Sequence, residues 1–165
     1  MTTENDEHQV RRSVGAILQN QDVSGAIIAS PDFAQYRFCW LRDGSFSAFA
    51  LDLAGEHAAS TKYHRWVNRA VTGIGDTIDQ AIAAHLEGEE LSALEMPPAR
   101  FSLGGVTVVD DWPNFQIDGY GTWLWSLGRH LELAGATDVP DEFVDSVARV
   151  ARYLATFSLS PCYDV

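Results

Sequence analysis

Residues 38–55 read FCWLRDGSFSAFALDLAG, and the spacing of their apolar side chains sets the fold class. After an aromatic approach, the apolar side chains of Phe46, Phe49 and Leu53 recur at intervals of three and four, the period of one helix face. Gly55 then offers the left-handed backbone conformation with which helices commonly end. The stretch therefore predicts a helix that begins directly after the aromatic residues.

The same helical period recurs along most of the chain. The further expected helices lie at residues 6–21, 56–71, 76–86, 118–135 and 140–157. Asp118 is expected to cap its helix, because a carboxylate at that position accepts hydrogen bonds from free backbone N–H groups. Five or six helices with almost no sheet predict an all-α fold.

Residues 88–118 break the helical pattern. Acidic residues and a Pro-Pro pair interrupt the apolar spacing, and two short β-prone runs, at residues 100–103 and 106–109, flank Gly104-Gly105. We expect a long loop that carries a small β-hairpin. Structureless loops of this length are uncommon unless they serve a function.

Composition limits the classes of partner. The 165 residues, 46% hydrophobic and 21% charged, suit one soluble globular domain, and 11 basic against 23 acidic residues give a net charge of −12. Nucleic acid and anionic membrane surfaces are therefore not expected as partners. No apolar run is long enough to span a membrane, and the acidic opening residues do not form a signal peptide, so a cytoplasmic location is expected.

The charged residues are unusual in kind, since Lys62 is the single lysine among 11 basic residues. An acid-rich, lysine-poor surface is typical of proteins from high salt, where screening removes self-repulsion. A GC-rich genome that favours arginine codons is the alternative explanation for the missing lysines.

Cysteine and histidine give no sign of a metal site or a cofactor. Cys39 and Cys162 lie far apart without zinc-like spacing, so two buried free thiols are expected, with a disulfide between them as the alternative. Four histidines also lack metal-ligand spacing and are expected on the surface or on a helix face: His57, His64, His85 and His130.

Two patches place aromatic, arginine, aspartate and amide side chains directly before expected helices, at residues 38–46 and 110–125. A sugar presents apolar C–H faces and a ring of hydroxyls, so its site needs flat aromatic surfaces and oriented polar groups. Both patches supply these groups. Two alternatives stay open: Trp123 and Trp125 fit core packing better than ligand binding, and Arg42 with Asp43 is equally explained as an ion pair with capping.

Three motifs, in order, resemble glycoside hydrolase family 15, the glucoamylase, glucodextranase and trehalase group. They are YRFCWLRDGSF at residues 36–46, NFQIDGYGTWLW at 114–125 and PCYDV at 161–165. The resemblance implies a partial (α/α)6 barrel with about half of the helices. Residues 1–165 would then be the N-terminal portion of the catalytic domain, with no second domain. It also implies inverting hydrolysis of an α-glucosidic bond, with an α-glucan, a maltooligosaccharide or an α-glucoside as substrate.

The resemblance places the substrate site where the inner helices begin. The implied substrate-binding residues are Trp40, Arg42, Asp43, Trp112, Asn114, Gln116 and Asp118. Arg42 and Asp43 would bind the outer hydroxyls of the non-reducing-end glucose, with Trp40 beside that sugar. Trp112 would touch the substrate at the mouth, Asp118 would shape the pocket, and the two amide side chains would contribute less.

The third motif of the family continues into Trp-Glu-Glu, whose first Glu is the general acid, and the general base lies further on. This sequence stops at Val165, so no catalytic residue is expected within it and no hydrolysis by it alone. One alternative is a non-catalytic remnant that binds glucose or maltose weakly, and another is an unrelated all-α scaffold. Apolar stripes at the open barrel edge are expected to cause self-association.

Overall fold

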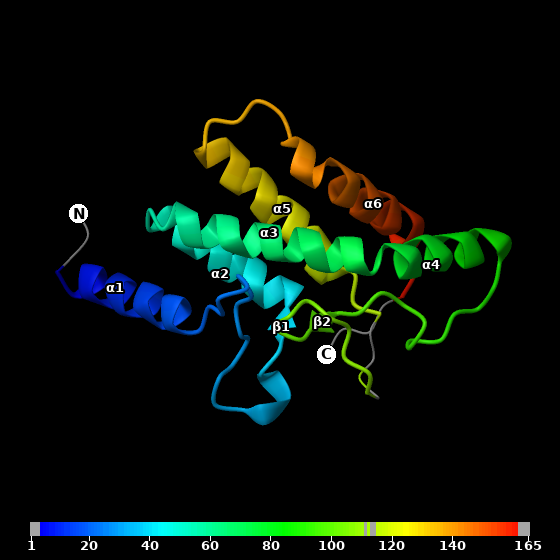
Figure 1. Cartoon of the computed structure of the whole chain (residues 1–165), viewed down its shortest axis with the longest axis horizontal. Coiled ribbons are helices and arrows are strands. Elements are labelled where there is room, and N and C mark those ends of the chain that lie inside the picture. The colour runs from blue at the N-terminus through cyan, green and yellow to red at the C-terminus, as the bar shows by residue number, and fades with distance from the viewer. Residues whose placement is uncertain (1–3, 111, 113–114, 162–165) are drawn as a thin grey trace.

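The computed structural model describes residues 4–110, 112 and 115–161. Over these residues the chain is helical, with one two-stranded sheet and a short 3-10 helix at Ala34–Tyr36 (Figure 1). The α-helices are α1 (Glu4–Gln19), α2 (Leu41–Leu53), α3 (His57–Gly73), α4 (Gly75–Glu87), α5 (Asp118–Leu133) and α6 (Asp141–Phe157). The expected all-α class is confirmed, and each expected helix is present with ends shifted by a few residues.

The helices form two antiparallel hairpins, α2 with α3 and α5 with α6, and α2 packs most extensively against α5 (Figure 1). Three polar contacts join α2 to α5, in the order Arg42 to Asp118, Ser45 to Ser126 and Asp52 to His130. Because the residue numbers increase together along both helices, α2 and α5 run parallel. Their first turns therefore lie at the same end of the molecule.

The core lies between these hairpins and contains large aromatic side chains. Those that are almost fully buried are Tyr63, Trp66, Phe101, Tyr120, Trp123 and Tyr153. Trp123 is thus a core residue, as expected. None of the described helices is both long and apolar enough to cross a membrane.

The expectation that Trp125 packs in the core is wrong, because its side chain is 43% exposed. Residues two positions apart on an α-helix point about 200° apart, so burial of Trp123 turns Trp125 outward. Its ring packs instead on α2, with centroids 5.6 Å from Phe46 and 4.8 Å from Phe49. The outer face of α2 and α5 therefore carries an exposed aromatic cluster.

The long loop pairs with a segment that the sequence analysis did not connect to it. Strand β2 (Arg100–Phe101) pairs antiparallel with β1 (Cys39–Trp40), directly before α2. The expected hairpin is present but short: one bridge joins Phe101 to Thr107, and the Ser102 N–H donates to the Val106 carbonyl at 2.9 Å. The loop is thereby attached to the beginning of α2.

The prediction that Asp118 caps α5 is wrong. Asp118 is the first residue of the helix, and the capping residue Ile117 makes no side-chain capping bond. The Asp118 carboxylate accepts a hydrogen bond from Arg42 instead, at 2.5 Å. A charge-assisted bond to a guanidinium is about twice as strong as a neutral one, which explains why this partner replaces the cap.

Candidate functional site

A small hollow lies where α2 and α5 begin. Its lining residues are Ala29, Tyr36, Trp40, Arg42, Asp43, Trp112 and Gln116. Five of the seven sequence-predicted site residues thus line one concavity, and a sixth, Asp118, contacts it through Arg42. Asn114 lies outside the described residues.

The hollow has a volume of about 140 Å³. Complete ligand pockets measure roughly 300–1,000 Å³, so this concavity is one wall of a site rather than an enclosed pocket. A shallower depression of about 430 Å³ adjoins it and shares Ala29, Arg42 and Asp43. The two charged side chains therefore stand between two concave surfaces.

Aromatic rings form the apolar side of the hollow. The Trp40 ring meets the Trp112 ring edge to face, with centroids 5.6 Å apart, and the Tyr36 ring is tilted against Trp40 at 5.5 Å. Trp40 is 5% exposed because β1 holds it against the loop, whereas Tyr36 is 41% exposed. We call Tyr36, Trp40 and Trp112 the aromatic wall.

Charged groups at the helix starts form the polar side. Arg42 and Asp43 stand in the first turn of α2, and Asp118 begins α5. The 2.5 Å bond from Arg42 to Asp118 joins the two helix starts, and both side chains are about two-fifths exposed. Gly119 permits this approach, because a Cβ there would lie 3.2 Å from the Leu41 Cβ. Asp43 is exposed at the positive end of the helix dipole.

Arg100 is a site-supporting residue that the sequence analysis missed. Its side chain is 5% exposed, and its guanidinium carbon lies 4.5 Å, 5.2 Å and 4.6 Å from the ring centroids of Phe38, Trp40 and Trp112. It also donates a hydrogen bond to Asp110. Arg100 therefore contacts the aromatic wall without itself lining the hollow.

Asp110 completes this support. Hydrogen bonds from the Trp112 backbone N–H, at 3.0 Å, and from Arg100 hold the pKa of the Asp110 carboxyl below its ordinary value. Asp110 thereby joins the backbone of Trp112 to the guanidinium that contacts its ring. No local signal in the sequence marks Arg100, because its partners come from separate segments of the chain.

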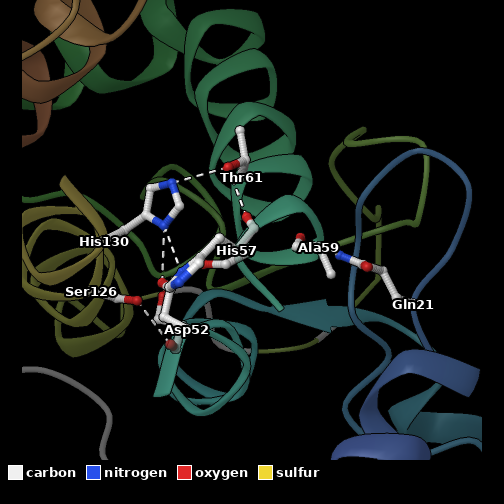
Figure 2. A network of polar contacts seen from close by, with 9 residues as sticks. Gln21, Asp52, His57, Ala59, Thr61, Ser126 and His130 are labelled. Atoms are coloured by element: carbon white, nitrogen blue, oxygen red, sulfur yellow. Dashed lines mark hydrogen bonds and ion pairs between the residues drawn. The ribbon is translucent and has the colours of Figure 1, made fainter. Parts of the chain in front are cut away.

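A second polar cluster lies at the far ends of α2 and α5 (Figure 2). Asp52 is 3% exposed, and its carboxylate contacts His57 Nδ1 at 2.9 Å, Ser60 Oγ at 2.6 Å and His130 Nδ1 at 2.9 Å. Burial raises the pKa of Asp52, but the hydrogen bonds outweigh burial and leave that pKa below its ordinary value.

Two of the histidines expected at the surface or on a helix face lie on helix faces that are buried. His64 is fully buried and His130 is 8% exposed, because both point inward between α3 and α5. Burial, aided by the nearby His130, lowers the pKa of His64 to about 3. The cluster could not be predicted from residue spacing, since its members come from three different helices. Cys39 is a buried free thiol as expected, and Cys162 lies outside the described residues.

Comparison with known proteins identifies the family. Residues 6–164 match the family described as glycosyl hydrolases family 15. The chain belongs to this family. It is 37% identical over 155 residues to the isomaltose glucohydrolase of Kribbella flavida, covering 93% of this chain and 40% of that protein. It is 24% identical to an uncharacterised glycosyl hydrolase of Methanocaldococcus jannaschii, covering 94% of this chain and 22% of that protein.

Solved glycosidase structures share this fold. A wild-type glycosidase and a glycosidase variant in complex with glucose each match with a TM-score of 0.88 and 34% identity. The match covers 99% of this chain and 45% of each glycosidase. The family 15 chain thus spans less than half the length of these relatives, and the expected partial barrel is confirmed.

Proposed function

We propose that this chain forms the N-terminal portion of a catalytic (α/α)6 domain that hydrolyses α-glucosidic bonds, and that it binds the non-reducing-end glucose. One observation carries the proposal: the aromatic wall and three polar side chains, Arg42, Asp43 and Gln116, line the same hollow. Family membership supports it, because the relatives with printed activities are glycosidases.

The chemistry of the hollow suits a sugar ring. Trp40 and Trp112 offer apolar surface to the C–H face of the ring, and Asp43 is exposed and free to accept hydrogen bonds from vicinal hydroxyls. Arg42 donates from the opposite side, and its bond to Asp118 fixes the direction of the guanidinium. Gln116, 6% exposed, adds an amide that both donates and accepts.

Inverting hydrolysis requires two carboxyl groups roughly 6.5–9.5 Å apart, one protonated and one ionised. Asp43 is an open carboxylate suited to hydroxyl binding, and Asp118 is engaged by Arg42. We therefore assign both carboxylates to binding and positioning, and the general acid and base to the part of the domain beyond these residues. The chain alone should bind sugar without hydrolysing it.

The proposed substrate class rests on the charge of the protein and on one relative of known name. A neutral α-glucoside fits a protein of net charge −12, and the relative that is 37% identical is named for isomaltose. We propose isomaltose as the first ligand to test, with maltose, a maltooligosaccharide and an α-glucan as the alternatives within the class. The cytoplasmic location stays a prediction.

Isothermal titration with isomaltose and with maltose at millimolar concentrations tests the proposal. We expect measurable binding that weakens at least tenfold in Asp43→Asn, since one charge-assisted hydrogen bond contributes about 1.5–3 kcal/mol. Asp76→Asn is the matched control, because Asp76 stands exposed in the first turn of α4, away from the hollow. Flat heats with every sugar, or equal binding by Asp43→Asn, would contradict the proposal, and glucose release by the chain alone would overturn the assignment of the acid and base.

A further inference from the structure

The polar cluster around Asp52 contains a set of potential metal ligands outside the sugar site. One ligand atom each from Asp52, His64 and His130 lies within 4.8 Å of the other two, and all three residues are buried. Asp52 comes from the end of α2, His64 from α3 and His130 from the end of α5. Two imidazoles and one carboxylate are a donor set that takes divalent first-row metal ions, Zn²⁺ among them.

The burial of His64 without hydrogen-bond partners points to a bound ligand. Its side chain is fully buried, and neither ring nitrogen has a hydrogen-bond partner among the described residues. A buried polar group without a partner costs about as much as a lost hydrogen bond, so burying an imidazole here is unfavourable unless something binds it. Its ring lies beside that of His130, with centroids 5.0 Å apart, and one of its nitrogens faces the other two donors.

Hydrogen bonds to both ring nitrogens hold the His130 side chain in place. The Thr61 hydroxyl donates to the His57 carbonyl at 2.8 Å, so its oxygen must accept from His130 Nε2 at 3.1 Å. His130 Nδ1 faces the Asp52 carboxylate at 2.9 Å (Figure 2). His130 Nδ1 and the Asp52 carboxylate therefore lie close enough together to bind one cation.

We propose that Asp52, His64 and His130 form a binding site for a first-row divalent cation, with Zn²⁺ as the ion that fits it and one coordination position left to water. Tetrahedral zinc with bonds of about 2.0–2.1 Å places its donors roughly 3.3 Å apart, so donor atoms that now lie up to 4.8 Å apart must approach by as much as about 1.5 Å through side-chain rotation.

The surroundings provide the outer support that metal ligands need. Ser60 Oγ donates to Asp52 Oδ2, and Thr61 accepts from His130 Nε2. The site lies close to solvent, because His57, which contacts Asp52, is 56% exposed. The bound ion would join α2, α3 and α5 at the end opposite the sugar site.

Zinc titration of the full chain after treatment with a chelator tests the proposal. We expect one equivalent of Zn²⁺ to bind per chain by calorimetry and to raise the melting temperature. His64→Phe keeps the volume of a buried ring and should lower zinc affinity at least tenfold. His8→Gln is the matched control, since His8 is exposed on α1 outside the cluster, and it should bind zinc as the unsubstituted chain does.

Two results would overturn the proposal. One is an unsubstituted chain that takes up no stoichiometric Zn²⁺, which would leave the hydrogen bond between His130 and Asp52 as the explanation of the cluster. The other is equal zinc affinity in His64→Phe. If that variant does not fold, nitrogen NMR of the unsubstituted chain decides: the ring signals of His64 and His130 must shift with one equivalent of zinc, and unchanged signals contradict the site.

Discussion

Replacing Arg100 by methionine removes the guanidinium behind the aromatic wall and keeps an unbranched apolar stem. Three rings, those of Phe38, Trp40 and Trp112, lose a cation 4.5–5.2 Å from their centroids. Each such contact contributes about 0.5–1 kcal/mol when exposed and about 2 kcal/mol when desolvated. Because one cation serves all three rings, we expect a combined loss of about 2 kcal/mol in the free energy of unfolding.

The loss of its bond from Arg100 leaves Asp110 without a large further cost in stability. Its side chain is 40% exposed and keeps the hydrogen bond from the Trp112 N–H, so the substitution does not leave a buried charge without a partner. For a chain of 165 residues, 1 kcal/mol corresponds to roughly 2–4 °C in melting temperature. The expected decrease for Arg100→Met is therefore about 4–8 °C.

Urea unfolding followed by circular dichroism measures the effect. Arg129→Met is the control, because Arg129 forms an exposed ion pair with Glu132 on α5, and its loss should change stability by less than about 0.5 kcal/mol. Arg100→Lys keeps the charge without the planar group and should lie between the methionine variant and the unsubstituted chain. A change of less than 0.5 kcal/mol in Arg100→Met would refute the reasoning, since the three ring contacts would then carry no net energy.

Three further outcomes are expected. Gly44→Ala should lower the free energy of unfolding in urea by about 1–3 kcal/mol, because the new Cβ would lie 2.5 Å from the Tyr63 ring. Gly128→Ala, whose new Cβ would meet nothing within 4 Å, should raise that free energy by about 0.5–1 kcal/mol. Equal effects of the two substitutions would contradict the packing around Gly44. Burial raises the pKa of the Cys39 thiol to about 12, so the reactive thiolate is scarce at pH 8.5 and grows only as pH rises toward 12. Mass spectrometry should find Cys39 alkylated by iodoacetamide in urea but not in the folded chain, and rapid labelling without urea would count against its burial. Self-association through the exposed aromatic cluster should appear as concentration-dependent elution in size-exclusion chromatography and decrease in Trp125→Gln; a monomer at every concentration would rule it out.

The helices could be predicted because their signals are local. The period of Phe46, Phe49 and Leu53 and the positive φ of Gly55, 84°, depend on the chain within a few residues. The site residues around Arg42 were also predicted, since the two motifs stand directly before helices whose first turns the fold brings together. Their role in binding sugar stays a prediction.

The features that the sequence analysis missed depend on contacts between distant segments. Arg100 is buried because β2 pairs with β1, about 60 residues earlier, and His64 is buried because α5 packs over α3. The Asp118 carboxylate accepts a hydrogen bond from the Arg42 guanidinium, 76 residues away, instead of capping its own helix. Helix spacing identifies an apolar face, but it does not tell which polar side chains that face will carry into the core.

The parallel pair α2 and α5 is tied at both ends, by Arg42 to Asp118 beside the hollow and by Asp52 to His130 at the far end. Ten residues of helix separate Arg42 from Asp52, a span of about 15 Å. Axial sliding by one residue, about 1.5 Å, would break both ties at once, and splaying at either end would strain the other. The two ties therefore resist sliding of α2 against α5, so the position of Arg42 at the proposed sugar site depends in part on a hydrogen bond at the far end of the same helix.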